Sequence, residues 1–336
     1  MTSQGKASWC ALFPGQGSQS PGMGKSLSDT FEEARRVFEE ADDTLAESLS
    51  ALCFDGPAEK LLMTVNTQPA LLTTCVAAWR VLSPRVAMPK AAAGHSVGEY
   101  AALVAAEVLS FADALRAVRA RGRAMQNAVP LDVGSMAAVI GMAADDLLAL
   151  CTELSDDRIV VPANYNAPNQ IVVAGDREAV ERVKEIAPTR GAKRVIELAV
   201  SAPFHSPLMQ PATEEMRSVL AEIDFSEPSF PVLCNVNAEV VGSGASAREN
   251  LVEQIASPVR WVETMQKMEH EHACRCGVEV GPGRVLAGLA RKICDELSVI
   301  GFSESTHLDQ TIEKVGPADT PHSAQRSDGP ARGATR

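Results

Sequence analysis

The stretch Lys90-Ala91-Ala92-Ala93-Gly94-His95-Ser96-Val97-Gly98-Glu99 joins three predicted pieces of structure. Its first part, Lys90 to Gly94, is a run of small residues short enough to be a buried strand, and an alanine-rich helical pattern continues from about Gly98 to Leu109. Between them lies a G-x-S-x-G pattern, whose serine sits on a strained strand-to-helix elbow with its hydroxyl exposed above the sheet. The pattern alone is common, so its place between a strand and a helix is what predicts Ser96 as a nucleophile.

Strands and helices alternate on both sides of this elbow. Upstream, Trp9 to Phe13 predicts a buried strand that runs into a glycine-rich turn at 14–19. A helix is predicted to open at Thr67-Gln68-Pro69-Ala70, with Pro69 at a position where its missing N–H costs nothing. Further strands are expected at 232–235, at 277–280 and near Val299, with helices between them. Such alternation is typical of an α/β fold with a mostly parallel sheet covered on both faces.

Between about Pro130 and Val200 the pattern changes to that of a smaller unit. Strands are predicted at 135–140, 158–163, 170–174 and 193–199, and helices at 143–154 and 177–186. This βαββαβ order matches a ferredoxin-like module. We therefore expect a small domain at 130–202, inserted into a discontinuous large domain at 1–129 and 203–302. The tail 303–336 is polar with few large apolar residues, so we expect it to be mobile.

Composition and charge exclude several classes of function. The 336 residues are 46% hydrophobic, yet no apolar run approaches the roughly 18 residues that cross a bilayer, and the N-terminus is polar, so we expect a cytoplasmic protein with no membrane partner. A net charge of -12 argues against a nucleic-acid partner, because phosphate binding depends on Lys and Arg. The eight cysteines form no C-x-x-C pair, which predicts reduced thiols and no metal site.

A serine hydroxyl needs a neighbouring base, and histidine is the usual one near neutral pH. Five of the six histidines are poor candidates. His95 would point away from the serine, and His307 and His322 lie in the tail. His270 and His272 fall in an acidic helix end, which is either solvated or a metal site. His205 remains, just before a helix with Ser206 as N-cap and Pro207 at its first position. A helix N-terminus disfavours a charged imidazole, so we expect His205 to be neutral. The alternative is a packed histidine at an interdomain hinge.

Arg121 stands out on a predicted helix over Phe111 to Met125. A helical wheel gathers the other arginines into a solvated basic stripe: Arg116, Arg119 and Arg123. Arg121 instead falls on the apolar side, among Ala114, Ala117, Val118 and Met125. An unpaired guanidinium there would cost several kcal/mol, and its planar fork suits a carboxylate. That carboxylate belongs either to a structural ion pair within the protein or to a bound substrate.

The glycine-rich turn after the first strand offers hydrogen-bond donors. Gln16, between Gly15 and Gly17, lies at the C-terminal end of that strand, where ligands of parallel sheets tend to bind. Together with the Val97 N–H at the head of the helix it could stabilise a tetrahedral oxyanion. The alternative is an ordinary glycine loop.

Together these residues resemble the malonyl-coenzyme A:acyl carrier protein transacylase family and, more widely, the acyltransferase domains of polyketide synthases. The motifs that carry the resemblance occur in order along most of the chain. They are Phe13-Pro14-Gly15-Gln16-Gly17-Ser18-Gln19, Thr67-Gln68-Pro69-Ala70-Leu71, Gly94-His95-Ser96-Val97-Gly98-Glu99, Arg121-Gly122-Arg123-Ala124-Met125-Gln126, Asn164-Tyr165-Asn166-Ala167-Pro168, Pro203-Phe204-His205, Val259-Arg260-Trp261 and Glu279-Val280-Gly281-Pro282-Gly283.

The resemblance implies an α/β-hydrolase-like large domain with a ferredoxin-like insert, and it implies roles for single residues. These are Ser96 as nucleophile, His205 as base, Gln16 and the Val97 N–H as oxyanion hole, Arg121 as binder of the malonyl carboxylate, Gln254 as the residue that orients the histidine without an acidic third member, and Asn166 as support from the small domain. Val97 and Phe204 resemble malonyl-selecting rather than methylmalonyl-selecting polyketide acyltransferases.

The implied activity is ping-pong transfer of malonyl from malonyl-CoA through Ser96 to the phosphopantetheine thiol of acyl carrier protein. It would supply fatty-acid or polyketide synthesis, in a monomer that needs no cofactor. Alternatives are a trans-acting polyketide synthase acyltransferase, an acyl hydrolase or thioesterase that uses the same Ser and His, and a non-catalytic scaffold. Because the chain is acidic, docking of an acidic carrier would need a local basic patch. Its candidate residues are Lys193 with Arg194, Arg284, and Arg291 with Lys292.

Overall fold

Strand β1 (Trp9–Phe13) lies in the middle of a parallel sheet in the computed structural model, which describes residues 8–130, 132–155, 158–200 and 202–318. The sheet has five strands, in the spatial order β7 (Val232–Leu233), β2 (Ala91–Gly94), β1, β8 (Cys276–Val280) and β9 (Ser298–Phe302). Every neighbouring pair among them is parallel. The predicted mostly parallel sheet is therefore confirmed.

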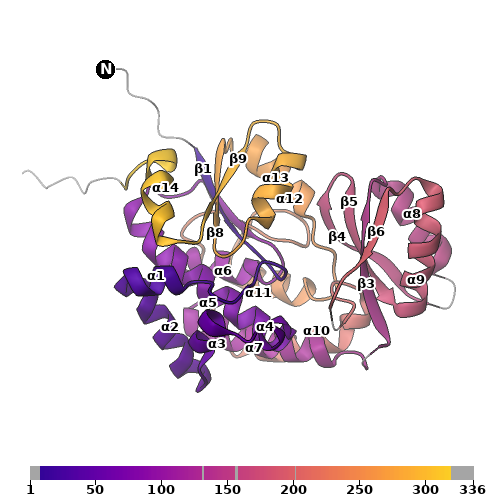
Figure 1. Cartoon of the computed structure of the whole chain (residues 1–336), viewed down its shortest axis with the longest axis horizontal. Helices are drawn as coiled ribbons and strands as arrows, with labels where there is room; N and C mark the ends of the chain where they lie inside the picture. Colours follow the sequence, from indigo (N-terminus) through magenta and orange to yellow (C-terminus); the bar gives the residue numbers. More distant parts are fainter. Residues whose placement is uncertain (1–7, 131, 156–157, 201, 319–336) are drawn as a thin grey trace, which may run out of the picture.

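Helices cover both faces of this sheet, so β1 is buried on both sides. Trp9, Ala11 and Phe13 join one hydrophobic cluster with the helices at 64–82, 98–105 and 111–127. Cys10 and Leu12 point the other way and join a second cluster with the helices at 261–270 and 285–293. Figure 1 shows these two helical layers with the strands between them. The helices of this larger unit are α1 (Lys25–Thr30), α2 (Glu32–Leu45), α3 (Leu49–Asp55), α4 (Ala58–Leu62), α5 (Thr64–Leu82), α6 (Gly98–Ala105), α7 (Phe111–Asn127), α10 (Gln210–Ala221), α11 (Gly244–Glu253), α12 (Trp261–His270), α13 (Val285–Ile293) and α14 (Leu308–Val315).

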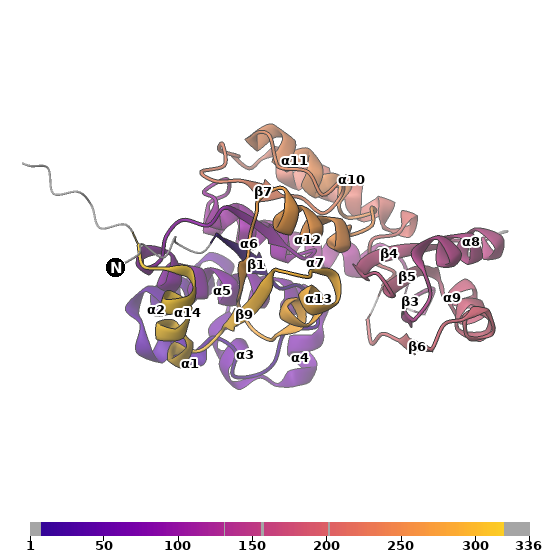
Figure 2. The same ribbon diagram turned by 90° about the horizontal axis from the view of Figure 1, so that it is seen from above.

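A second, antiparallel sheet forms the smaller unit beside the first (Figure 2). Its elements follow the predicted βαββαβ order: β3 (Gly134–Ile140), α8 (Ala144–Leu154), β4 (Val160–Ala167), β5 (Gln170–Asp176), α9 (Arg177–Ile186) and β6 (Arg194–Glu197). The spatial order β4-β5-β3-β6 is that of a ferredoxin-like sheet. The two units meet at Val259, which exchanges backbone hydrogen bonds of 2.9 Å with Ala163 and Tyr165 of β4.

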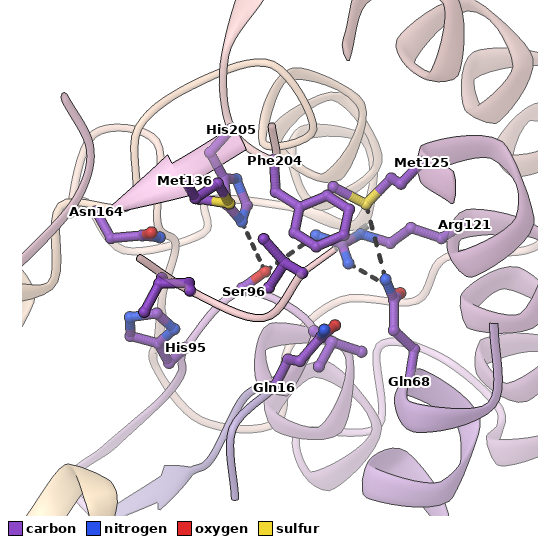
Figure 3. A pocket seen from close by; sticks show the side chains of 13 residues that line it. Gln16, Gln68, His95, Ser96, Arg121, Met125, Met136, Asn164, Phe204 and His205 are labelled. Carbon is purple, nitrogen blue, oxygen red and sulfur yellow. Dashed lines mark hydrogen bonds between the residues drawn. The ribbon is translucent and has the colours of Figure 1, made fainter. Parts of the chain in front are cut away.

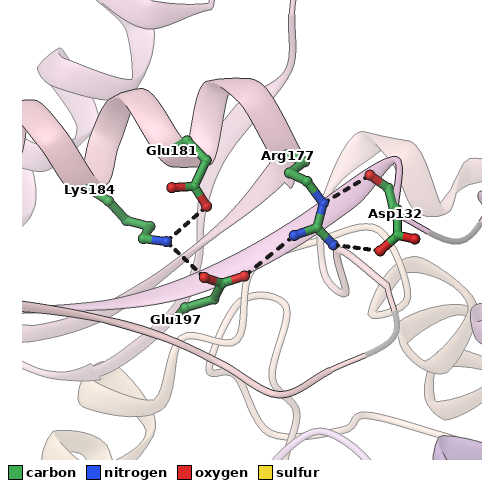
Figure 4. Close-up of polar contacts among 5 residues, drawn as sticks. All are labelled: Asp132, Arg177, Glu181, Lys184 and Glu197. Carbon is green, nitrogen blue, oxygen red and sulfur yellow. Dashed lines mark hydrogen bonds and ion pairs between the residues drawn. The ribbon is translucent and has the colours of Figure 1, made fainter.

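Ion pairs tie the edge strand β6 to helix α9 (Figure 4). Lys184 donates to Glu181 at 2.8 Å and to Glu197 of β6 at 2.7 Å. Arg177 reaches the other oxygen of Glu197 at 3.4 Å and donates to the backbone carbonyl of Asp132 at 2.9 Å. These exposed pairs contribute little each, but together they join the entry into β3, α9 and the last strand of the small sheet.

Pro69 does not open a helix, as the sequence had predicted, but lies inside α5, which begins at Thr64. A proline there leaves the carbonyl of Val65, four residues earlier, without its helical N–H partner. Nη1 of Arg119 donates to that carbonyl at 2.7 Å and to Asn66 Oδ1 at 2.9 Å. Arg119 also pairs with Glu47 and is only 7% exposed, so its assignment to a solvated stripe was wrong.

The segment after residue 302 is ordered as far as the structure describes it, which corrects the predicted mobile tail. A short 3-10 turn leads into α14, and Pro317 forms an antiparallel bridge with Val86. Val315 is buried in the core, with Leu308 and Ile312 packed against it. Their spacing gives one apolar helix face within a segment whose average composition is polar. Residues 319–336 lie outside the described residues.

None of the helices in the described part of the chain is long and apolar enough to span a bilayer.

Candidate active site

Ser96 lies on a tight elbow between β2 and α6. Its φ is 53°, in the left-handed region that non-glycine residues rarely adopt. The turn fits because its flanking residues have no side chains: a Cβ on Gly94 would lie 1.9 Å from the Gly98 carbonyl, and one on Gly98 would lie 2.2 Å from the Phe13 carbonyl oxygen. The elbow is therefore pressed against β1 and holds the serine above the sheet.

Asn235, which the sequence did not single out, clamps this elbow. Its Oδ1 accepts the Ser96 backbone N–H at 2.7 Å, and its Nδ2 donates to the Gly94 carbonyl at 2.7 Å. Asn235 follows β7, at the same end of the sheet as the elbow. Only the strand order brings it there, since 139 residues separate it from Ser96.

His205 is in contact with the serine. Its Nε2 lies 2.8 Å from Ser96 Oγ, and its Nδ1 lies 2.8 Å from the backbone carbonyl of Gln254. A carbonyl oxygen can only accept, so Nδ1 carries the proton and Nε2 is free to accept that of the serine. Burial and, next, the charge of Arg121 lower the pKa of His205 to about 3. The imidazole is thus neutral near pH 7, as expected from the sequence. The main cause is burial and not the helix N-terminus that the sequence suggested.

Arg121 is buried, at 1% exposure, and reaches the same hydroxyl. Its Nη1 donates to Gln68 Oε1 at 2.9 Å, and its Nη2 donates to Gln254 Oε1 at 2.8 Å and to Ser96 Oγ at 3.2 Å. No carboxylate among the described residues lies within ion-pair distance of it, and its Nε has no partner there. Of the two alternatives for its carboxylate, the structural ion pair is not what the structure shows.

Gln254 and Glu99 complete a network beneath the elbow. The Gln254 side chain donates to Glu99 Oε2 at 2.7 Å and to the Ser96 carbonyl at 3.2 Å, while its oxygen accepts from Arg121. Glu99, which is 1% exposed, also accepts the backbone N–H of Asn235 at 2.9 Å. Burial raises the pKa of Glu99 to about 7. Gln254 thus contacts the histidine through its backbone and the arginine through its side chain.

His95 and Asn166 form a separate pair at the edge of the site. Nε2 of His95 lies 2.8 Å from Asn166 Oδ1, and the imidazole packs at 5.4 Å from the Trp261 ring. The side chain of His95 therefore points away from the serine hydroxyl, as the elbow geometry predicted. Asn166 comes from β4, so the small unit helps to fix the residue next to Ser96.

Ser96, His205 and Arg121 line a cavity of about 100 Å³ (Figure 3). Its lining residues are Gln16, Gln68, His95, Ser96, Val97, Arg121, Met125, Met136, Asn164, Leu198, Val200, Phe204 and His205. Gln16 points toward it and bonds Thr64 Oγ1 only weakly, at 3.4 Å. The Val97 backbone N–H has no acceptor among the described residues. Both predicted oxyanion donors thus lie at the cavity and are available.

The arrangement suits acyl transfer to a serine from a donor that carries a negative charge. Ser96 donates to a neutral imidazole and accepts from a cation, so it is poised to lose its proton next to a site for an anion. Of the apolar lining residues, the sequence had singled out Val97 and Phe204. Met136, Leu198 and Val200 were not predicted, because such residues carry no motif signal. Among the described residues, no group of three His, Cys, Asp or Glu side chains is arranged to hold a metal ion.

Comparison with known sequences gives a consistent answer. Residues 11–308, which include every site residue above, match the acyl transferase domain family. The malonyl CoA-acyl carrier protein transacylase of Bacillus subtilis is 45% identical over 305 residues, covering 90% of this chain and 96% of the relative. The protein of the same name from Escherichia coli is 42% identical over 308 residues, covering 90% and 98%.

Solved structures agree with these relatives. An acyl carrier protein S-malonyltransferase from Vibrio cholerae superposes with a TM-score of 0.88 at 39% identity, covering 91% of this chain and 100% of that one. A type II PKS acyl-carrier protein in complex with its malonyl-transacylase contains a chain that superposes with a TM-score of 0.89 at 42% identity, covering 91% and 99%.

Proposed function

Because this chain belongs to the acyl transferase family, we propose that Ser96, His205 and Arg121 carry out its malonyl transfer. The chain is a malonyl-CoA:acyl carrier protein transacylase, an enzyme that moves a malonyl group from malonyl-CoA to an acyl carrier protein. The observation that carries the assignment of roles is that one hydroxyl, Ser96 Oγ, contacts both the imidazole and the buried guanidinium.

In the first half-reaction the Ser96 oxygen attacks the thioester carbonyl carbon of malonyl-CoA. Its proton passes to Nε2 of His205, and the carbonyl oxygen becomes an oxyanion facing the Val97 N–H and the Gln16 side chain. When the tetrahedral intermediate collapses, the carbon–sulfur bond breaks and the coenzyme A thiolate takes the proton from His205. The malonyl group is left as an ester on Ser96.

In the second half-reaction the phosphopantetheine thiol of the carrier protein attacks this ester. The thiol proton passes to Nε2 of His205, the carbon–oxygen bond to Ser96 breaks, and the proton returns to the serine oxygen. Throughout, the fork of Arg121 holds the malonyl carboxylate, and the backbone carbonyl of Gln254 keeps the imidazole in its tautomer. All of these groups come from one chain, so we propose that the monomer is active.

The carrier protein would dock near the cavity by charge. The candidate basic residues Lys193, Arg194, Arg284, Arg291 and Lys292 are all exposed. Lys292 donates to Gln170 Oε1 of the small unit at 2.7 Å, so it bridges the two units at the surface. A basic docking patch formed by these residues stays a prediction.

The test is intact-protein mass spectrometry after mixing with malonyl-CoA. We expect a single malonyl adduct on the wild type, its loss in Ser96→Ala and its retention in the control Ser110→Ala, whose hydroxyl only caps α7 at the surface. Adding holo acyl carrier protein should move the adduct to the carrier. Absence of any adduct would indicate a scaffold, and rapid release of free malonate without carrier would indicate a hydrolase.

A further inference from the structure

Glu99 is a buried carboxylate that the proposed mechanism does not use. It lies on the first turn of α6, three residues after Ser96, and is 1% exposed. Its Oε2 accepts two hydrogen bonds, whereas its Oε1 is buried without a partner in the described part of the chain. Burying an ionised oxygen without a hydrogen-bond partner costs free energy. The negative charge of Glu99 must therefore be offset by a positive charge nearby.

The amide of Gln254 connects Glu99 to Arg121. Gln254 Oε1 accepts from Nη2 of Arg121 at 2.8 Å, and Gln254 Nε2 donates to Glu99 Oε2 at 2.7 Å. A single amide therefore separates the buried cation from a buried carboxylate. No carboxylate among the described residues pairs directly with Arg121. Glu99 is the carboxylate whose charge acts on the guanidinium through the amide, where it opposes the lowering of the Arg121 pKa by burial.

We propose that Glu99 is the resident counter-anion of Arg121 and that it limits how tightly the site holds a diacid donor. The inference rests on the proposed function, in which the malonyl carboxylate binds Arg121. That carboxylate brings a second negative charge toward a cation which Glu99 already offsets. The repulsion weakens the malonyl complex relative to a complex with a neutral acyl group, and so keeps the malonyl group transferable to the carrier.

Protonation of Glu99 removes its negative charge, so it should strengthen malonyl binding at Arg121. Burial places the pKa of this carboxyl at about 7 in the empty site, so the neutral form grows as the pH falls from 8 to 6. The titratable groups whose charges act on Glu99, and the imidazole of His205 in the same site, do not change charge in that range. Burial raises the pKa values of Tyr100 and Cys234 to about 12, and the pKa of His205 lies at about 3. Arg121 keeps its charge.

Equilibrium binding of two donors tests the proposal. In a Ser96→Ala background, which binds without reacting, calorimetry at pH 8 compares Glu99 with Glu99→Gln, a substitution of the same shape. We expect malonyl-CoA to bind about fivefold or more tightly in the variant. Acetyl-CoA should change less than about twofold, since it has no carboxylate to repel. Glu107→Gln, an exposed acid just after the same helix, should change neither donor.

Two results would overturn the proposal. If both donors weaken equally in Glu99→Gln, the residue is only structural, and if neither changes, its charge is not felt at Arg121.

A second measurement needs no change at residue 99. In the same background, the ratio of malonyl-CoA to acetyl-CoA affinity should rise as the pH falls from 8 to 6, and the phosphates common to both donors cancel in this ratio. A ratio independent of pH contradicts the inference. Failure of the proposed function is separate, because then wild-type protein forms no malonyl adduct at all.

Discussion

Nη2 of Arg121 lies 3.2 Å from Oγ of Ser96, so a buried cation and the elbow hydroxyl are joined by a hydrogen bond. A malonyl thioester carries a carbonyl and a carboxylate separated by one methylene group. The short separation of the two protein groups matches that donor, since in the proposed mechanism the serine attacks the carbonyl while the guanidinium binds the carboxylate. Burial chiefly, and then the charge of Arg121, lower the pKa of His205, whose imidazole contacts the same hydroxyl.

Replacing Arg121 by alanine should change the choice of donor. Loss of a buried charge pair costs about 2 to 5 kcal/mol, so kcat/KM for malonyl-CoA should fall by roughly 30-fold to several thousandfold. Acetyl-CoA should lose far less, because it never pairs with the guanidinium. Steady-state rates with both donors are the measurement, with the exposed Arg123→Ala on the same helix as control. Equal loss for the two donors would remove the assigned role.

Stability below neutral pH should depend on His205. Its pKa is about 3 in the folded protein and 6.5 ordinarily, so below pH 6.5 the unfolded chain binds a proton that the folded chain does not. Its contribution is therefore present above pH 6.5 and is lost as the pH falls. From pH 6.5 to 5 the wild type should lose about 2 kcal/mol of unfolding free energy relative to His205→Gln. Urea unfolding at both pH values measures this difference, and parallel losses in the two proteins would contradict the buried, neutral imidazole.

Two glycine-to-alanine changes should have opposite effects. In Gly98→Ala the new Cβ would meet the Phe13 carbonyl oxygen at 2.2 Å, so the elbow must move off β1, which should lower stability by about 1 to 3 kcal/mol and abolish adduct formation. In Gly288→Ala, inside α13, the nearest atom is 3.9 Å away, and stability should rise by about 0.5 to 1 kcal/mol. Thermal unfolding measures the stability of each variant, and mass spectrometry measures the malonyl adduct. A Gly98→Ala protein that is as stable and active as the wild type would contradict this elbow geometry.

Arg119 should stabilise α5 through the carbonyl that Pro69 leaves unpaired. Arg119→Met should reduce the unfolding free energy by about 1 to 3 kcal/mol, because Val65 O then has no partner. The control Arg116→Met removes an exposed pair with Asp113 and should change stability by less than about 1 kcal/mol. In a Pro69→Ala background the added N–H should reduce the effect of Arg119→Met. Similar losses for the two arginine variants would show that the Val65 bond is unimportant.

Local pattern was enough for much of this protein. The alternation of short apolar strands with helices predicted the parallel sheet, and the βαββαβ order predicted the inserted sheet, because periodicity reports which faces of an element are buried. The flanking glycines of Ser96 predicted the elbow, because only residues without a Cβ fit that close approach. Periodicity and flanking glycines both lie within a few residues of the feature they predict.

Local pattern failed where burial depends on a distant segment. Arg119 falls on the polar side of its helical wheel, yet α5 covers it and supplies the carbonyl it binds. From local pattern Glu99 is an ordinary acidic residue at a helix start, and Asn235 has no signal beyond ending a predicted strand. In the tail, composition averaged over 34 positions hid the apolar face that buries Val315.

Arg121 separates the two kinds of information. The sequence alone determined that it lies on the buried side of its helix, because the spacing of its apolar neighbours fixes that side. That its partners are two amide side chains rather than a protein carboxylate was decided only by the tertiary structure, which brings Gln68 and Gln254 to it from 53 and 133 residues away. Spacing along the chain sets the direction of a side chain, whereas its partners depend on how distant elements pack.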